Sequence, residues 1–213
     1  MQHQFYSLQK VAEIVGGRLV GSQTERKISD LLIDSRHLMD PAKTLFFALK
    51  SQRNDGHRYV DDLYERGVRA FVVCQQPESS CPGASFIVVP DTLKALQALA
   101  SYHRQQFEIP VIGITGSNGK TIVKEWLYQM LSPDYSIVRS PKSYNSQVGV
   151  PLSVWQMNES DELAIFEAGI SEPEEMMPLQ GIIRPTIPGD LLMYFNTTGT
   201  SLKISATVAP IST

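Results

Sequence analysis

The stretch "VIGITGSNGKTIVKEWL", Val111–Leu127, decides the fold of the second half of the chain. An apolar run is followed by a glycine-containing turn and then by an amphipathic segment that starts with lysine and threonine. A strand, a turn and a helix in this order direct backbone N–H groups and the helix N-terminus at an anion. A lysine at such a turn reaches the β- and γ-phosphates, and the next hydroxyl holds Mg²⁺. The sequence therefore predicts a phosphate-binding loop formed by Gly116, Ser117, Asn118, Gly119, Lys120 and Thr121.

One departure from the usual pattern concerns the first glycine. The pattern G-x-x-x-x-G-K-[ST] requires glycine at residue 114, whereas this chain has Ile114 and carries glycines at 113 and 116. Two interpretations stay open, a variant phosphate loop and a glycine-rich connection that binds nothing. The surrounding strand, the GKT triplet and the helix favour the phosphate loop.

A carboxylate for a metal follows another apolar run. Glu167 ends the segment "LAIFE", which reads as a buried strand. In doubly wound folds the carboxyl end of a strand lies beside the phosphate loop, and a carboxylate there can bind Mg²⁺ directly or through water. The alternative is a glutamate that only caps the following turn.

The order of the elements predicts an α/β protein with two domains. Expected helices and strands alternate over residues 1–85, which indicates a small α/β domain. A helix that opens at Asp91 occupies an expected linker, residues 86–109. Residues 110–187 read as part of a doubly wound parallel sheet that needs more strands than the chain supplies. Residues 188–213 form a tail that is rich in Ser and Thr, for which a weak hairpin or disorder is expected.

Composition excludes some classes of function. The chain has 213 residues and a formal net charge of −3, so nothing indicates a nucleic-acid partner or an anionic membrane surface. No signal peptide or membrane-spanning run is visible, and a cytoplasmic location is expected. The two cysteines and four histidines form no metal pattern. We interpret His103 as a helix residue and not as a ligand.

Several ordered motifs resemble the Mur ligase family. In the second half they are "GITGSNGKT", "SYNSQVGVPLSVW" and "IFEAGIS", and in the first half "IDSR", "LFFALKSQRNDGHRYV" and "GVRAFVV". The resemblance covers residues 1–187 and identifies the first part with the uridine-binding domain of these ligases. The best fit is the member that adds D-alanyl-D-alanine to UDP-N-acetylmuramoyl-tripeptide. The segment "RSPKSYNSQVGVPLSVWQ" is most similar to the ligase half of fusion proteins that also contain an alanine racemase.

The resemblance implies an ATP-dependent amide ligase of peptidoglycan precursor synthesis. ATP phosphorylates the terminal carboxylate of the tripeptide, and the amine of D-alanyl-D-alanine attacks the acyl phosphate. By resemblance, Lys120 and Glu167 are the catalytic residues, and Thr121 and Glu167 are the ligands of Mg²⁺. The implied substrate-binding residues are Ser35, Arg36, Asp55, Gly56, His57, Asn145 and Ser146.

Each of these residues also has a structural interpretation. Residues 34–36 can form a solvated turn. Asp55 can cap the helix that starts at Arg58, and Asn145 can cap a loop.

The resemblance ends abruptly after "RPTI". A family histidine, the carbamylated lysine, the rest of the sheet and the C-terminal domain are not found, so we expect a truncated, inactive fragment whose tail arises from a frameshift. Another chain that carries the missing ligase or racemase domains is one partner that this reading allows. Two alternatives stay open, a non-catalytic remnant that binds UDP-sugar or nucleotide and an unrelated P-loop kinase. "IDSR" and "NDGH" argue against the kinase.

Overall fold

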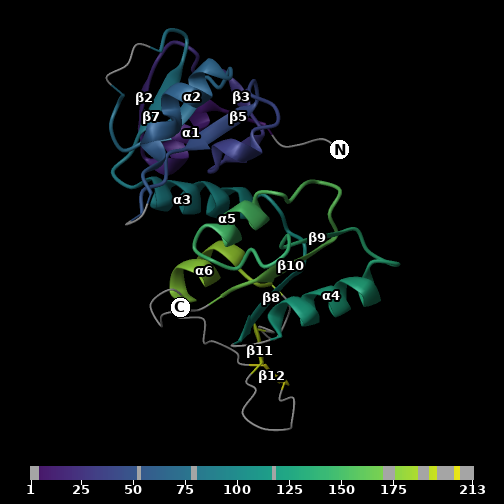
Figure 1. The fold of residues 1–213 in the computed structure, drawn as a ribbon. Helices are drawn as coiled ribbons and strands as arrows, with labels where there is room; N and C mark the ends of the chain where they lie inside the picture. Colours follow the sequence, from purple (N-terminus) through teal and green to yellow (C-terminus); the bar gives the residue numbers. More distant parts are fainter. Residues whose placement is uncertain are drawn as a thin grey trace, which may run out of the picture. The chain divides into compact units, whose positions relative to one another are not determined.

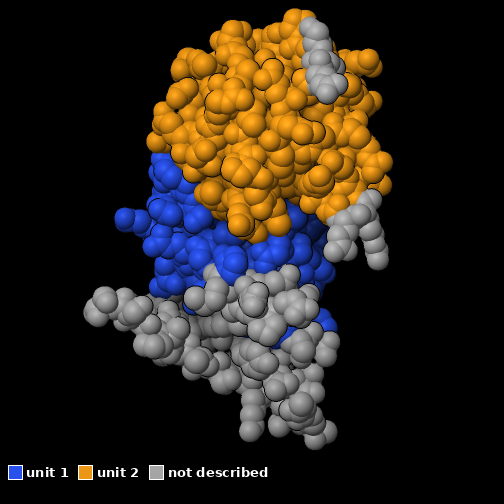
Figure 2. Space-filling model, turned by 90° about the vertical axis from the view of Figure 1, so that its left-hand side faces the viewer, with its two compact units in different colours: residues 1, 100–213 blue, residues 2–99 orange. Residues whose placement is uncertain are grey.

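The chain folds into two compact units, residues 2–99 and residues 100–213 (Figure 2). The structure is a computed structural model. It describes residues 5–51, 54–77, 81–116, 119–169, 176–186, 192–195 and 204–206. Both units are mixed α/β with largely parallel sheets, so the predicted fold class is confirmed.

The first unit is built on a five-stranded sheet with the order β2-β7-β6-β5-β4 (Figure 1). Its strands are β2 (Arg18–Val20), β4 (Asp30–Leu32), β5 (Thr44–Phe47), β6 (Ala70–Val73) and β7 (Ser85–Val88). The strands β4 to β7 run parallel, and β2 pairs antiparallel with β7. Every residue of β5 and β6 is buried, as expected for strands covered on both faces.

The helices of the first unit follow local signals in the sequence. In α1 (Leu8–Val15) the Ser7 hydroxyl caps the start, and Gly16 ends the helix with a φ of +62°. The short turn η1 (Ser35–His37) precedes a loop, whereas η2 (Gly56–Tyr59) leads directly into α2 (Val60–Glu65). The sequence did not predict β2 or the two-residue strands β1 (Tyr6–Ser7) and β3 (Lys27–Ile28), which pair antiparallel.

The two units divide between residues 99 and 100, inside α3 (Thr92–Arg104). The Asp91 carboxylate accepts hydrogen bonds from the backbone N–H groups of Leu93 and Lys94, which caps this helix as its sequence predicts. Strand β7 continues past residue 85, the expected end of the first domain. We therefore propose residue 99 as its limit.

The second unit holds a sheet with the order β12-β11-β8-β10-β9. Its strands are β8 (Val111–Gly116), β9 (Ile137–Arg139), β10 (Leu163–Glu167), β11 (Leu192–Phe195) and β12 (Ile204–Ala206). All pairings are parallel except that of β11 with β12. The rest of the expected tail lies outside the described residues.

Helices cover both faces of this sheet (Figure 1). They are α4 (Lys120–Leu131), α5 (Gly149–Val154) and α6 (Met176–Ile183). Val123 and Leu127 of α4 pack on Ile114 and Ile165, whereas Val150 of α5 belongs to a second cluster with α6. The strand β8 thus ends directly before α4 with its apolar side chains enclosed. In the part of the chain that the structure describes, no helix is long and apolar enough to cross a membrane.

Candidate nucleotide and substrate sites

The predicted phosphate loop connects β8 to α4. Gly116 has a φ of +134° and Gly119 a φ of +80°, a region that glycine enters without strain. Gly119 immediately precedes α4 and, as a glycine, has no side chain that could cap this helix end. A helix N-terminus of this kind offers its first N–H groups to an anion or to water. Ser117 and Asn118 lie outside the described residues.

Lys120 and Thr121 open α4 as the motif predicts. The Lys120 ammonium donates a hydrogen bond back to the carbonyl of Gly116, so the side chain folds over the loop. The Thr121 hydroxyl donates to Glu167 Oε2 at 3.1 Å and lies 3.4 Å from the Ser143 hydroxyl. The start of α4, the end of β10 and the segment after β9 thus meet at Thr121.

Glu167 occupies the carboxyl end of β10, beside β8. Its side chain is fully buried, and its backbone N–H donates to the Ser140 hydroxyl at 3.0 Å. Oε1 lies 2.8 Å from the Lys124 ammonium but is not aligned with it as a hydrogen bond. The two carboxylate oxygens therefore face different partners, Lys124 and Thr121.

These groups fit a hard divalent cation. A carboxylate and a hydroxyl lie side by side, and Mg²⁺ prefers such oxygen ligands together with phosphate oxygens and water. No cluster of three or more His, Cys, Asp or Glu side chains suited to a metal occurs among the described residues. Any Mg²⁺ here would depend on Thr121, Glu167 and oxygens from a bound ligand.

The segment that contains Asn145 and Ser146 is anchored beside the end of β10. The Asn145 carbonyl accepts a hydrogen bond from Gly169 N–H at 2.6 Å, and a Cβ on Gly169 would come within 2.9 Å of the Asn145 side chain. Ser146 Oγ accepts a hydrogen bond at 3.1 Å from the backbone N–H of Gly149, the first residue of α5. Asn145 is thus close to the Glu167 strand end, whereas Ser146 has a structural contact.

In the first unit, residues 34–36 form a tight turn after β4. The Asp34 carboxylate accepts from Arg36 N–H at 3.0 Å and from Arg36 Nη2 at 2.6 Å. These Arg36 contacts hold the pKa of Asp34 well below its ordinary value and raise the pKa of Arg36. The Ser35 carbonyl accepts from Arg66 at 2.8 Å. Arg36 itself stays exposed.

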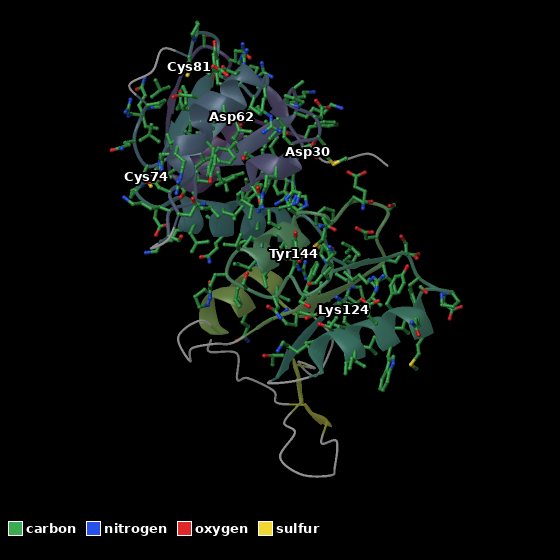
Figure 3. All side chains as sticks on the ribbon, viewed as in Figure 1. Asp30, Asp62, Cys74, Cys81, Lys124 and Tyr144 are labelled. Atoms are coloured by element: carbon green, nitrogen blue, oxygen red, sulfur yellow. The ribbon has the colours of Figure 1, made fainter. Side chains whose placement is uncertain are left out.

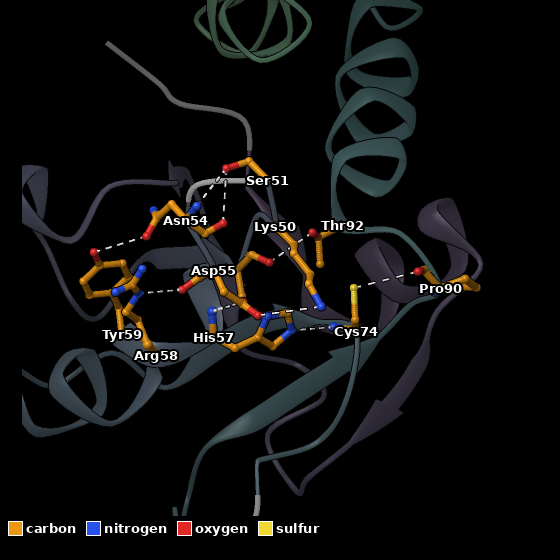
Figure 4. A network of polar contacts seen from close by, with 11 residues as sticks. Lys50, Ser51, Asn54, Asp55, His57, Arg58, Tyr59, Cys74, Pro90 and Thr92 are labelled. Atoms are coloured by element: carbon orange, nitrogen blue, oxygen red, sulfur yellow. Dashed lines mark hydrogen bonds and ion pairs between the residues drawn. The ribbon is translucent and has the colours of Figure 1, made fainter.

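Asp55 and His57 form a polar network with Cys74, which follows β6 (Figure 4). Cys74 N–H donates to His57 Nε2 at 2.9 Å, so the ring proton sits on Nδ1 and points to Asp55 Oδ1 at 2.6 Å. The His57 backbone N–H, followed by its ring, lowers the pKa of Asp55. Both ring nitrogens of His57 are therefore engaged inside the protein.

Gly56 is required by its surroundings. A Cβ at this position would lie 2.8 Å from the backbone of Ala48 and Leu49. Asp55 caps η2, because its side chain accepts a hydrogen bond from the His57 backbone N–H. This contact is similar to the structural interpretation, in which Asp55 only caps a helix. A pocket of about 260 Å³ adjoins the turn and is lined by His57, Val60, Val73, Gln75, Gln76 and Pro77.

Sequence reasoning overlooked Lys124 and Ser140. Lys124 lies on the side of α4 that faces the sheet, and it is fully buried (Figure 3). The available signal was a lysine flanked by Val123 and four residues after Lys120, on the face that packs against the strands. Ser140 gave no signal beyond its place after a strand.

The geometry first defines a class. A parallel strand that ends in Gly116 and a helix that follows Gly119, with lysine, threonine and a buried glutamate at the helix start, are typical of doubly wound α/β proteins that bind phosphate at this point.

The comparisons then define the family. The profile of the Mur ligase family, catalytic domain, matches residues 27–104, and that of the Mur ligase middle domain matches residues 114–188. The chain belongs to the Mur ligase family.

Curated relatives point to one branch of it. The chain is 37% identical over 172 residues to UDP-N-acetylmuramoyl-tripeptide--D-alanyl-D-alanine ligase of Borreliella burgdorferi, covering 76% of this chain and 37% of the relative. It is 35% identical over 180 residues to the ligase of the same name from Bacillus subtilis, covering 84% of this chain and 39% of the relative. The chain therefore spans about two fifths of the length of these relatives.

Solved structures of similar fold belong to the same branch of the family. MurF from Acinetobacter baumannii superposes with a TM-score of 0.79 at 28% identity, covering 87% of this chain and 40% of that one. MurF ligase from Thermotoga maritima in complex with ADP superposes with a TM-score of 0.66 at 26% identity, covering 79% and 38%.

Proposed function

We propose that this chain carries the nucleotide-binding and UDP-precursor-binding parts of an ATP-dependent amide ligase. In this proposal the ligase joins D-alanyl-D-alanine to UDP-N-acetylmuramoyl-tripeptide through an acyl phosphate. The observation that carries it is the contact of Thr121 with Glu167 at the start of α4, next to Lys120. The activity for which the two curated relatives are named supports it, and so does the ADP bound by the related Thermotoga maritima ligase.

The loop would hold the phosphates of ATP. Gly116 and Gly119 would let the backbone approach them, and the first N–H groups of α4 would supply donors. The Lys120 ammonium would exchange the Gly116 carbonyl for the β- and γ-phosphates. Thr121 and Glu167 would hold Mg²⁺, which neutralises phosphate charge when it is bound. Asn145 stands beside this point, and we propose that it faces the substrate.

The first unit would hold the uridine end of the precursor. The carboxyl ends of its parallel strands meet at one edge, where ligands bind in open α/β sheets. Ser35 and Arg36 follow β4 there, and Nη1 of Arg36 is not used in its contacts with Asp34. Because both ring nitrogens of His57 are engaged, we propose that Asp55, Gly56 and His57 shape the pocket without donating to the ligand themselves.

Calorimetric titration with ATP and Mg²⁺ tests the nucleotide site. The chain should bind, and Lys120→Ala should weaken binding strongly. Lys94→Met, which removes an exposed lysine of α3, is the matched control and should bind as the unchanged chain does. Binding that is insensitive to Lys120→Ala in a folded sample would refute the loop assignment.

A second candidate is that these two units bind the UDP-precursor and the nucleotide without catalysis, because the two curated relatives named for the ligase activity match this chain over only about two fifths of their own length. A ligation assay with ATP, UDP-N-acetylmuramoyl-tripeptide and D-alanyl-D-alanine separates the two roles. Amide formation that disappears in Lys120→Ala supports the ligase. Binding of ATP and of the precursor without amide formation supports the binding role for this chain.

A further inference from the structure

Lys124 is a buried charge for which the proposed reaction has no use so far. Its side chain, like that of Glu167, has no exposed surface. Burying an ammonium and a carboxylate carries a large desolvation cost, which only good partner geometry offsets. The partners of Lys124 therefore indicate what the buried charge does.

The Lys124 ammonium connects three parts of the site. It donates to the Ser140 carbonyl at 2.8 Å and to the Lys142 carbonyl, and it lies 2.8 Å from Glu167 Oε1. Ser140 and Lys142 belong to the segment after β9, and Glu167 ends β10. One side chain of α4 thus fixes the helix that carries Thr121 against the strand end that carries Glu167.

The contact with Lys124 gives the two carboxylate oxygens of Glu167 different partners. Oε1 faces Lys124, whereas Oε2 accepts from the Thr121 hydroxyl. The backbone N–H of Glu167 is held separately by Ser140. The carboxylate therefore has a fixed orientation, with Oε2 and Thr121 Oγ1 as a pair of oxygens on the same side.

The local charge is also balanced. Lys124 offsets the charge of Glu167, its nearer carboxylate at 2.8 Å, and also lies 3.4 Å from Glu125 Oε1. The other oxygen of Glu125 forms an ion pair with Arg139. Because no larger acidic cluster suited to a metal occurs in the described ranges, this pair of oxygens alone would attract a divalent cation weakly. The cation would need the charge and the oxygens of bound phosphates.

We propose that Lys124 is a positioning residue for the cation that accompanies the nucleotide. It holds Glu167 by Oε1 and presents Oε2 together with Thr121 Oγ1 to a divalent cation bound to phosphate. This inference rests on the proposed nucleotide site. It adds a residue that acts through Glu167 and touches neither the nucleotide nor the metal.

The test compares ATP dissociation constants in Mg²⁺ and in EDTA for the full chain and its variants. Lys124→Met keeps the length of the side chain and removes its charge and donors. We expect the Mg²⁺-dependent gain in ATP affinity to fall by about 10–100-fold, the usual effect of removing the partner of a metal ligand. Affinity in EDTA should stay unchanged, and Lys94→Met should keep the full gain.

The outcomes separate the two proposals. Equal weakening in Mg²⁺ and in EDTA would mean that Lys124 only supports the fold, which overturns the inference. If Lys124→Met keeps the full Mg²⁺-dependent gain in ATP affinity, the inference is overturned as well, but the proposed nucleotide site is not. Absence of ATP binding, or of any Mg²⁺ effect in the unchanged chain, is instead a failure of the proposed function.

Lys124→Met leaves Glu167 buried without its partner, so thermal unfolding is measured first. If that variant does not fold, Glu167→Gln and Lys124→Met/Glu167→Gln replace it, because the double variant buries a neutral pair. When Lys124 acts through Glu167, both variants show the same reduced Mg²⁺ gain. A further loss in the double variant would overturn the inference.

Discussion

His103 provides a quantitative test of how the second unit is packed. Its side chain is 2% exposed, its Nε2 lies 3.0 Å from the Met157 carbonyl, and its ring lies against Phe107 and Trp155. Burial lowers the pKa of His103 from 6.5 to about 4, and the Met157 contact opposes this shift only in part. The folded unit therefore holds the imidazole neutral at pH values where the unfolded chain binds a proton.

The sign and size of the effect follow from linkage. The stabilisation is fully present above pH 6.5, the unfolded pKa, and is lost as pH falls towards about 4, the folded pKa. Integrating between these two pKa values predicts that His103 lowers the free energy of unfolding by about 2 kcal/mol between pH 7 and pH 5. Below pH 4 the loss approaches about 3 kcal/mol.

Urea unfolding followed by tryptophan fluorescence measures this loss. The two tryptophans, Trp126 and Trp155, both lie in residues 100–213, so the signal reports this unit. His103→Gln is the matched variant, because an amide can donate to the Met157 carbonyl without titrating. Subtracting its unfolding free energy from that of the unchanged chain cancels the carboxylates that titrate in both.

We expect this difference to shrink by about 2 kcal/mol between pH 7 and pH 5. Parallel pH profiles for the two proteins would refute the burial of a neutral imidazole at this position.

Two further predictions concern the same unit. Arg104 is buried and donates to the carbonyls of Phe107, Ile183 and Arg184 at 2.7–3.0 Å. Arg104→Lys should lower the free energy of unfolding, measured in urea, by about 2–4 kcal/mol, because one ammonium cannot reproduce the planar guanidinium and its several donors. A loss under about 0.5 kcal/mol, which is typical of a neutral surface change, would contradict these contacts. Gly149→Ala should lower stability by about 1–3 kcal/mol, because its Cβ would lie 2.9 Å from the Tyr144 backbone. Gly181→Ala, with nothing within 4 Å of its Cβ, is the control and should be neutral or stabilising; equal effects at both glycines would show that crowding is not the cause.

Elements with a local signal could be predicted from the sequence. Ser7 and Gly16 mark the ends of α1, and the apolar runs of β5, β6, β8 and β10 are buried throughout. The phosphate-loop motif likewise gave the strand, the turn and the helix in the right order, because each depends on residues that are close in the chain. The proximity of Thr121 and Glu167 could also be predicted. Parallel strands end at one edge of a sheet, so the helix that follows β8 starts beside the end of β10.

Features set by distant contacts could not be predicted. Strand β2 has only three residues, and it forms because β7 offers a free edge. The burial of Lys124 depends on carbonyls that lie 16 and 18 residues further along the chain. His57 was expected to contact the substrate, but the sequence does not show that Cys74 and Asp55 occupy both of its ring nitrogens.

The most direct test of the two proposed binding sites is a calorimetric titration of one sample, first with UDP-N-acetylmuramoyl-tripeptide and then with ATP and Mg²⁺. We predict that both ligands bind, that Lys120→Ala weakens only ATP binding, and that Arg36→Ala weakens only binding of the UDP ligand. A folded sample that binds neither ligand would contradict the proposed function, as would two variants that lose both ligands together.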